Sequence, residues 1–324
     1  MRAFFNPADR PEMPSWLLLA GMTISVFLAQ YGHAFSVDPV RALPAAAALC
    51  ALGVAIVAGR TTGRPRLAAG AAAFAQMTLF TLLGVVLAYA LAANAGDLWD
   101  GRLAAADRAI GFDWPVVRSR LDMAPPVVWL LGLAYHSLIL QMIVVIVVLS
   151  ALGKFDTLRT TVCAAIGSGF VSILISGVTP AMGNLFDPAD YLHLWPSVAW
   201  QEQGLITGLR DGSLRSLDLT MLMGIVSFPS FHATLAAIFV WAFRAVPRLA
   251  VPGGGWAVLT IVATPVFGGH YGVDVIAGLL LAPPAIIAAR RLTRPAATSP
   301  IGSASLAQLR RPRATRPGPT PRSR

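Results

Sequence analysis

The sequence predicts an all-α membrane protein, a polytopic bundle of about eight transmembrane helices. Of its 324 residues, 56% are hydrophobic and only 12% are charged. The mean hydropathy of +0.67 is well above that of soluble globular domains. The apolar residues also fall in long continuous runs, for which a bilayer is the natural solvent.

Eight apolar runs are candidates to cross about 30 Å of hydrocarbon. The sixth and seventh are short and need flanking residues to complete a span. The first starts behind Glu12 and lacks a clear small-residue cleavage site, so we expect it to be retained. The runs are Trp16 to Gln30, Ala42 to Ala58, Leu67 to Ala93, Val127 to Leu152, Thr161 to Val178, Ala233 to Val246, Trp256 to Phe267 and Val273 to Ala289.

Basic residues in the short connections set the expected orientation. They lie between spans two and three, four and five, and six and seven, which is one side of the membrane if the helix count is even. The positive-inside rule makes that side cytoplasmic, with both termini inside. An Ala-, Arg-, Gly- and Pro-rich composition favours a bacterial inner membrane. The basic residues are Arg60, Arg64, Arg66, Lys154, Arg159, Arg244 and Arg248.

The formal charge of +10 is concentrated at the C-terminal end. The segment from Arg290 to Arg324 carries nine arginines and no acidic residue, and the rest is nearly neutral. Its composition predicts a disordered tail beside anionic lipid headgroups, and no nucleic-acid recognition module accompanies it. We therefore divide the chain into N-terminal transmembrane helices (1–93, the third joining the core), a membrane domain with the candidate site (94–290) and a basic cytoplasmic tail (291–324).

Two long connections, Asn94 to Pro126 and Thr179 to Ser230, then lie outside. Their tryptophans suit a headgroup-level belt, and Leu103 to Ile110 is expected to form a short interfacial helix. The alternative is that both are only solvated connections. Cys50 and Cys163 fall in apolar runs, so we expect inert core residues rather than a disulfide framework or a zinc site.

Two histidines stand at the outer mouths of spans in unusual local settings. In Ser227-Phe228-Pro229-Ser230-Phe231-His232, proline and serine favour the opening of a helix, whose free N–H groups attract anions. In Gly268-Gly269-His270-Tyr271-Gly272-Val273-Asp274, the glycines allow a close approach of backbone or ligand. His270 and Asp274 are four residues apart, so on a helix they share one face and can touch.

These residues suit phosphoryl transfer. Asp274 would fix the tautomer of His270, and His270 would attack phosphorus to give a phosphohistidine. His232 would protonate the leaving oxygen and later deprotonate the acceptor. We expect Ser230, with Arg210 and Arg215 of the preceding outer connection, to bind phosphate, although the arginines could instead pair with nearby acids.

The other histidines have no comparable context. His136 is expected to be a buried hydrogen-bonding residue, and His33 and His193 surface residues. No helix carries a two-histidine cluster or converging carboxylates, so the sequence predicts no metal site. It also lacks a glycine-rich phosphate-binding loop with its lysine, so nucleotide hydrolysis has no support. No cofactor is therefore expected.

At these residues the sequence resembles the type 2 phosphatidic acid phosphatase superfamily, in particular its inositol phosphorylceramide synthase-like branch. The segments 228–232 and 268–274 match that branch's second and third motifs, and the likeness covers roughly Gly101 to Ala289. The resemblance implies a six-helix catalytic core, with the first two spans as additions, and a metal-independent phosphohistidine mechanism. It implies His270 as nucleophile, Asp274 as its orienting residue and His232 as acid and base.

The sequence also departs from the superfamily. Its first motif, a lysine followed seven residues later by Arg-Pro, is not found, because Lys154 is followed at that spacing by Thr161. The usual third-motif arginine, six residues before the histidine, is Thr264. In the synthase-like branch, Arg210 and Arg215 could supply the missing charge.

The leading hypothesis is thus an enzyme at the outer membrane face. It either hydrolyses a lipid phosphate or moves a phospho-headgroup to an acceptor alcohol, with the synthase-like resemblance favouring transfer. A second hypothesis is a transporter or channel with a proton or ion path through the histidines, but this predicts polar residues deep in several spans. A third is a non-catalytic scaffold.

Overall fold

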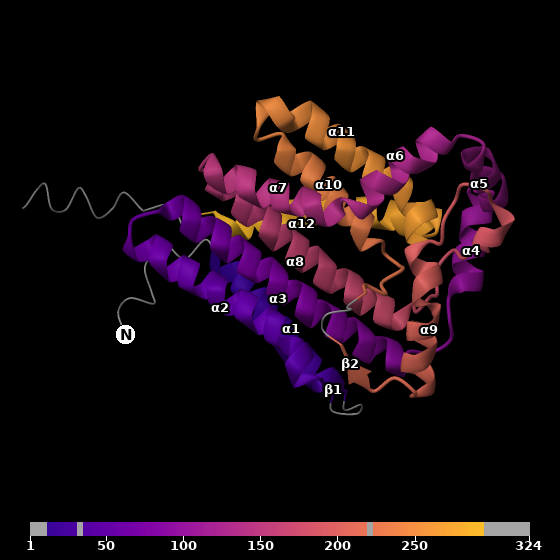
Figure 1. Cartoon of the computed structure of the whole chain (residues 1–324), viewed down its shortest axis with the longest axis horizontal. Coiled ribbons are helices and arrows are strands. Elements are labelled where there is room, and N and C mark those ends of the chain that lie inside the picture. The colour runs from indigo at the N-terminus through magenta and orange to yellow at the C-terminus, as the bar shows by residue number, and fades with distance from the viewer. Residues whose placement is uncertain (1–11, 31–34, 219–222, 295–324) are drawn as a thin grey trace, which may run out of the picture. The chain divides into compact units, whose positions relative to one another are not determined.

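The computed structural model describes residues 12–30, 35–218 and 223–294, which form a helical bundle (Figure 1). The long helices are α1 (Met13–Gln30), α2 (Pro39–Thr61), α3 (Pro65–Asn94), α8 (Phe155–Val178), α11 (Pro247–Ala263) and α12 (Gly272–Thr293). The shorter helices are α4 (Asp100–Ala109), α5 (Trp114–Asp122), α6 (Pro125–His136), α7 (Leu138–Ala151), α9 (Val198–Asp211) and α10 (Phe231–Phe243). Pro188–Asp190 is a 3-10 turn, η3, and Thr264–Gly268 is a π-helical turn, η4, at the end of α11. The predicted all-α fold class is confirmed.

Each of the eight predicted apolar runs forms helix. Among the described residues, six helices are long and apolar enough to cross a membrane, and a bent pair makes up to seven. α10 is apolar but has only 13 residues. The helix that contains the seventh run is longer than the run itself, because α11 already begins at Pro247. The last helix continues past residue 290 to Thr293, and the predicted tail from residue 295 onward lies outside the described residues.

The fourth run, predicted as one span, is broken. α6 and α7 are bent by 54° around Ser137. The amide of Gln141 donates to the Ala134 carbonyl at 3.3 Å and to the Thr260 hydroxyl of α11 at 2.8 Å. Polar side chains that bond to backbone carbonyls inside a helix commonly accompany a kink. Apolar periodicity does not reveal such a break.

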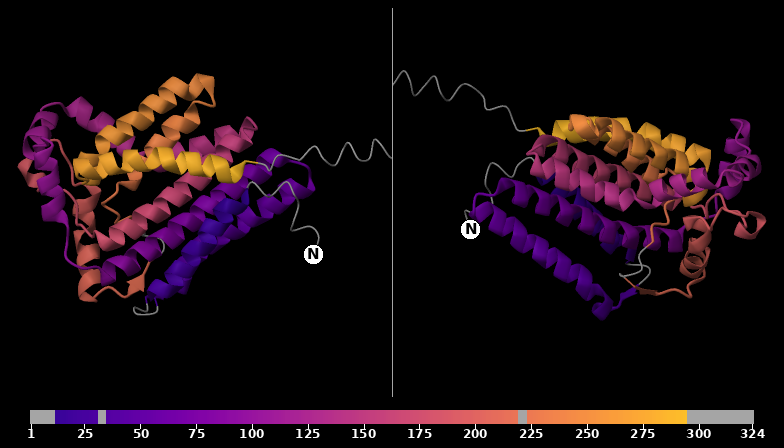
Figure 2. Two further views of the ribbon diagram at one scale, coloured as in Figure 1. Left: turned by 180° about the vertical axis from the view of Figure 1, so that it is seen from behind. Right: turned by 45° about the horizontal axis from the view of Figure 1, so that its top comes forward.

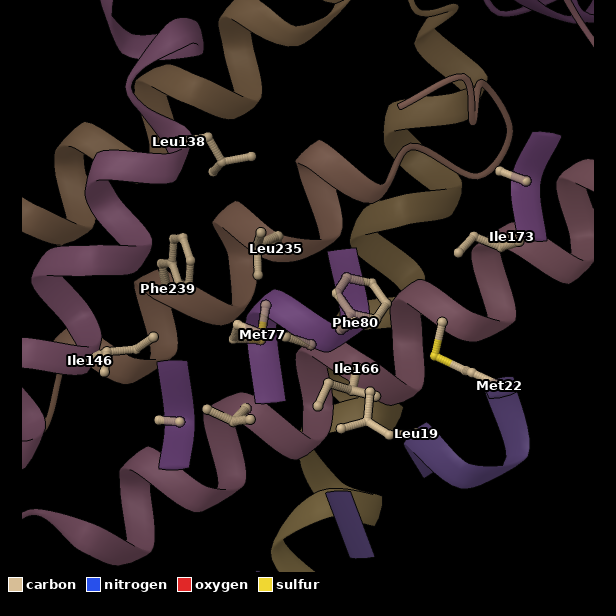
Figure 3. Close-up of a cluster of buried hydrophobic side chains, with 14 of the residues drawn as sticks. Leu19, Met22, Met77, Phe80, Leu138, Ile146, Ile166, Ile173, Leu235 and Phe239 are labelled. Atoms are coloured by element: carbon tan, nitrogen blue, oxygen red, sulfur yellow. The ribbon is translucent and has the colours of Figure 1, made fainter. Parts of the chain in front are cut away.

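The core lies between α3 and α8, with α1, α7 and α10 packed around them (Figure 3). Met22 and Ile166 are 0% exposed, and Phe239 is 1% exposed. Gly169 of α8 lies directly against the Phe80 ring, where a Cβ would collide. Packing of this kind holds helices together in a bilayer, where lipid tails are as apolar as the core. The first span, α1, therefore belongs to the packed bundle.

The two ends of the bundle differ. The connections α2–α3, α7–α8 and α10–α11 lie at one end, and α4, α5 and α9 lie at the other (Figures 1 and 2). At the first end, Arg60 of α2 and Arg159 of α8 are 3.5 and 3.7 Å from the Glu12 carboxylate. The basic connections therefore share one end of the bundle (Figure 1).

Two short strands join the connection between α1 and α2 to the connection between α9 and α10. β1 (Ser36–Val37) and β2 (Ser216–Leu217) pair in parallel, and Ser36 N–H donates to the Arg215 carbonyl at 2.9 Å. Arg41 of α2 forms an ion pair with Asp218 just after β2. The chain between α1 and α2 is thus fastened to the segment that follows α9.

Two predicted environments are wrong. His136 is exposed rather than buried: it is the last residue of α6, at the bend, and its ring contacts the Tyr135 ring edge-on. Cys50 is exposed on α2, which packs mainly on α3, whereas Cys163 is buried as expected.

Other local predictions hold. The predicted helix near Leu103 to Ile110 is present as α4, and His193 is exposed as predicted. His33 lies outside the described residues.

Candidate active site

The two histidine motifs meet in one pocket, at the end of the bundle that carries α4, α5 and α9. The ring centroids of His232 and His270 are 6.1 Å apart. Tyr135 of α6 and Glu202 of α9 line the same pocket. Packing of α10 against α12 brings the two histidines together, although each belongs to a different span.

The start of α10 positions His232. Ser230 is the N-cap residue, and its hydroxyl accepts a hydrogen bond from the Ala233 N–H at 3.3 Å. The predicted helix start is therefore present, and it places His232 in the first turn. The imidazole stacks on the Tyr135 ring, with centroids 4.9 Å apart and an interplanar angle of 18°. This stacking holds the plane of the imidazole ring.

The backbone before α12 positions His270. The residue follows η4 and Gly269, whose φ of 74° is the left-handed conformation that glycine adopts readily. The side chain is buried, and Nδ1 lies 3.0 Å from the Ser227 carbonyl oxygen. A carbonyl oxygen only accepts hydrogen bonds, so Nδ1 must carry the proton. Nε2 then keeps its lone pair.

Asp274 lies behind this histidine and is 0% exposed. Its Oδ2 is 3.5 Å from Nδ1 of His270 and accepts hydrogen bonds from Ser227 Oγ and Tyr271 N–H, both at 2.9 Å. The predicted contact between the two residues is present, but its geometry is not that of two residues on one helix. His270 precedes the helix, and Asp274 occupies the third position of α12, where it forms a capping box with Tyr271.

The outer connection from residue 94 to residue 126 is built into the site. Asp107 of α4 accepts hydrogen bonds from the N–H groups of Gly272 and Val273, both at 2.8 Å. Asp100 accepts from the Gly183 N–H at 2.9 Å and from the Tyr271 hydroxyl at 3.0 Å. Both carboxylates therefore hold the start of α12 and the chain after α8, so this connection is more than a solvated loop.

The predicted phosphate-binding residues do not line the histidine pocket. Arg210 donates to the Ala95 and Gly96 carbonyls at 3.3 and 2.9 Å, and Arg215 donates to the carbonyls of Leu209 and Leu214. Neither guanidinium lines the histidine pocket. Ser230 is buried at the N-cap of α10. Phosphate binding by these three residues stays a prediction.

Sequence reasoning missed a buried arginine. Arg118 of α5 is 5% exposed, and its guanidinium donates to the Asn184 side-chain and main-chain oxygens at 2.5 and 3.2 Å. No carboxylate of the described residues forms an ion pair with it, and its Nε has no partner. The Asn184 N–H donates to the Gly269 carbonyl at 2.6 Å, directly beside His270. The arginine thus reaches the site through one residue.

Sequence reasoning also missed Glu202. The side chain is 4% exposed, and its Oε1 has no hydrogen-bond partner. Burial raises the pKa of this carboxyl group to about 8. Glu202 sits between Gln201 and Gln203 on an amphipathic helix, so nothing in the local sequence distinguished it from a surface acid.

A substitution at Gly269 tests how tightly the backbone before His270 packs against the start of α9. A Cβ at Gly269 would lie 2.5 Å from the Ala199 Cβ and 3.0 Å from the Ser197 Oγ, and the positive φ adds strain. Gly269→Ala is expected to shift His270 and to lower kcat/KM by about 10²-fold, the cost of an ångström of misplacement. Gly21→Ala on α1, where no atom lies within 4 Å, is the control. Equal activity of both variants would contradict a tightly held His270.

Fold and site together define a class: a helical integral membrane protein with a buried His–Asp pair and a second histidine in one pocket. A family model described as the PAP2 superfamily matches residues 101–288, which include α4 and both histidine motifs. The chain belongs to the PAP2 superfamily, and membership suggests phosphatase or phosphotransferase activity. No curated protein and no solved structure matches the chain.

Proposed function

We propose that the protein transfers phosphoryl groups of lipid phosphates through a phosphohistidine on His270, without a metal ion. The observation that carries this proposal is the setting of the His270 ring. Its Nδ1 faces the Ser227 carbonyl and the Asp274 carboxylate, so Nε2 is free to act as a nucleophile. No three His, Cys, Asp or Glu side chains of the described residues are grouped to hold a metal ion.

In the first step, the Nε2 lone pair of His270 forms a bond to phosphorus. The bond from phosphorus to the leaving oxygen breaks, and protonated His232 gives its proton to that oxygen. The phosphorylated imidazole keeps its proton on Nδ1 and is positively charged. The Asp274 carboxylate at 3.5 Å stabilises that charge.

In the second step, a water molecule or an alcohol gives its proton to His232 as its oxygen bonds to phosphorus. The N–P bond breaks, and its electron pair returns to Nε2 of His270. Water yields a phosphatase and an alcohol yields a transferase. We propose transfer of a phospho-headgroup as the main reaction, in line with the two motifs that resemble inositol phosphorylceramide synthases.

A second, mainly apolar hollow next to the histidine pocket supports the proposal that the substrate is a lipid. Its lining comes from α3, α8, α9 and the connections between helices, and includes Arg210. It shares Ala181, Ile206 and Ile225 with the histidine pocket. An acyl chain in this hollow would bring the attached phosphate toward His270.

We further propose that the site faces the outer, periplasmic side of a bacterial inner membrane. The basic connections lie at the opposite end of the bundle, and basic connections stay in the cytoplasm. Both termini would then be cytoplasmic, and the arginine-rich tail would contact anionic headgroups. Accessibility of single cysteines introduced at Asp97 and Gly153 to a membrane-impermeant reagent tests this orientation.

The function itself is tested with detergent-purified protein and a panel of lipid phosphates, with excess EDTA or added Mg²⁺. We expect the rate in EDTA to stay within about twofold of the rate in Mg²⁺, because the nucleophile is an imidazole rather than a metal-bound water. Free phosphate from a monoester, or a free phospho-headgroup from a diester, identifies hydrolysis, and a new phospho-headgroup lipid identifies transfer. Activity that EDTA removes and Mg²⁺ restores would rule out the proposed mechanism.

A further inference from the structure

The Glu202 carboxyl group is the one acidic side chain that lines the histidine pocket among the described residues. It is 4% exposed, and its Oε1 is buried without a hydrogen-bond partner. Leaving a buried polar atom unpaired is unfavourable. At the wall of the pocket that His232 and His270 also line, the unpaired oxygen points to a partner that arrives with the substrate.

The charges around the pocket limit which kind of phosphate group can bind beside Glu202. No lysine or arginine occurs among the described residues that line it. Arg210, on the same helix as Glu202, donates to carbonyls at the end of α3, and Arg118 reaches the site only through Asn184. Hydrogen-bond donors for phosphoryl oxygens must therefore come largely from neutral groups and the histidines.

We propose that Glu202 is a specificity-determining residue of this site, whose protonated carboxyl group donates a hydrogen bond to a non-bridging oxygen of a lipid phosphodiester. This inference rests on the proposed function. A phosphodiester carries one negative charge, whereas a phosphomonoester carries about −1.5 to −2 at pH 7. A pocket lined by no lysine or arginine among the described residues, and with a neutral acid at its wall, suits the single charge better.

The protonation state of Glu202 follows from its surroundings. The titratable groups that line the same pocket are Tyr135 on α6, His232 on α10 and His270 before α12, and Tyr89 on α3 interacts electrostatically with Glu202. None of them is a fixed cation that would hold the carboxyl group ionised. Burial raises its pKa to about 8, so the group is mostly protonated at pH 7 and mostly ionised at pH 9. Ionisation removes the donor and places a negative charge against the phosphate.

The test uses fluorescent diacylglycerol lipids that differ only in the phosphate: phosphatidylglycerol and phosphatidylinositol as diesters, and phosphatidic acid as monoester. Release of the same diacylglycerol is measured between pH 7 and pH 9. We expect wild-type kcat/KM for diesters to fall about tenfold further than kcat/KM of Glu202→Gln over this range, as one additional ionisation near pH 8 requires. The amide of Glu202→Gln is a permanent donor, and loss of the His232 proton lowers the activity of both proteins equally.

Two more variants complete the design. Asp211→Asn removes an exposed acid from the other end of α9 and should keep the wild-type profile. Glu202→Asp keeps an ionisable donor and should retain a loss of activity at alkaline pH, which provides a second reading if Glu202→Gln does not fold. The preference of the wild type for diesters over phosphatidic acid should rise from pH 7 to pH 9, because the dianion suffers the greater repulsion.

Three results would overturn the inference. An alkaline loss of activity in Glu202→Gln as large as that of the wild type would assign the titration to another group. A folded but inactive Glu202→Gln, with wild-type activity that rises toward pH 9, would make the carboxylate a base. Cleavage of phosphatidic acid alone would reject the diester and leave the proposed function standing. Unchanged activity in His270→Ala in the same assay would instead reject the proposed function.

Discussion

Replacing His270 with alanine is expected to lower turnover by about 10⁴-fold or more, the largest effect of any single substitution in this chain. Loss of a covalent nucleophile removes the whole two-step route, and other groups that act with it cannot compensate. The side chain is buried, and its removal leaves the Ser227 carbonyl and Asp274 without the imidazole. We therefore expect some loss of stability as well.

The measurement combines turnover with detection of the covalent intermediate. Wild-type protein incubated with a lipid labelled at phosphorus should retain label that is stable to base and labile to acid, as a phosphohistidine is. His270→Ala should show neither turnover nor label. His193→Ala is the matched control, because this exposed histidine lies in the same half of the chain and bonds only to Asp122 among the described residues. Label that persists in His270→Ala would place the nucleophile elsewhere.

The structure gives the two candidate phosphate-binding arginines backbone partners. Arg210 and Arg215 were expected to bind phosphate, and both guanidinium groups donate to backbone carbonyls. The buried cation nearest along the hydrogen-bond network is Arg118, through Asn184. An unpaired charge at 5% exposure is costly, which is why such residues often mark functional sites. Counting charges along an outer connection could not rank these arginines.

The positions of the spans were predictable, because a bilayer demands continuous apolar stretches and leaves a strong signal in the sequence. The starts of α10 and α12 were predictable for a local reason: proline, serine and glycine favour particular backbone conformations. Both histidines were found in this way. Their meeting in one pocket could be inferred only from the shared membrane face and from the resemblance.

The remaining features depend on contacts between distant segments. The bend at Ser137 involves Gln141 and Thr260 on another helix, and the start of α12 is held by Asp107 of α4. Glu202 becomes part of the site only because α9 folds back over η4. No local pattern encodes these pairings, since each partner is an ordinary polar residue in its own segment.

Asp274→Asn separates the orienting role of this carboxylate from its structural role. The asparagine oxygen can take the place of Oδ2 and accept the same hydrogen bonds from Ser227 and Tyr271. Its amide group then falls where Oδ1 now has no partner. We expect the melting temperature in detergent to change little, because the packing and the two hydrogen bonds remain.

Activity should nevertheless fall by about 10²–10⁴-fold, because the negative charge that stabilises the phosphorylated His270 is gone. Asp274→Ala is the matched comparison: it also removes the capping box of α12 and should lower both activity and melting temperature. The double variant with His270→Ala should be no less active than His270→Ala alone, since the two residues act as a unit. If Asp274→Asn kept near wild-type turnover, the backbone carbonyl of Ser227 would suffice to orient the nucleophile, and the carboxylate would be a helix cap alone.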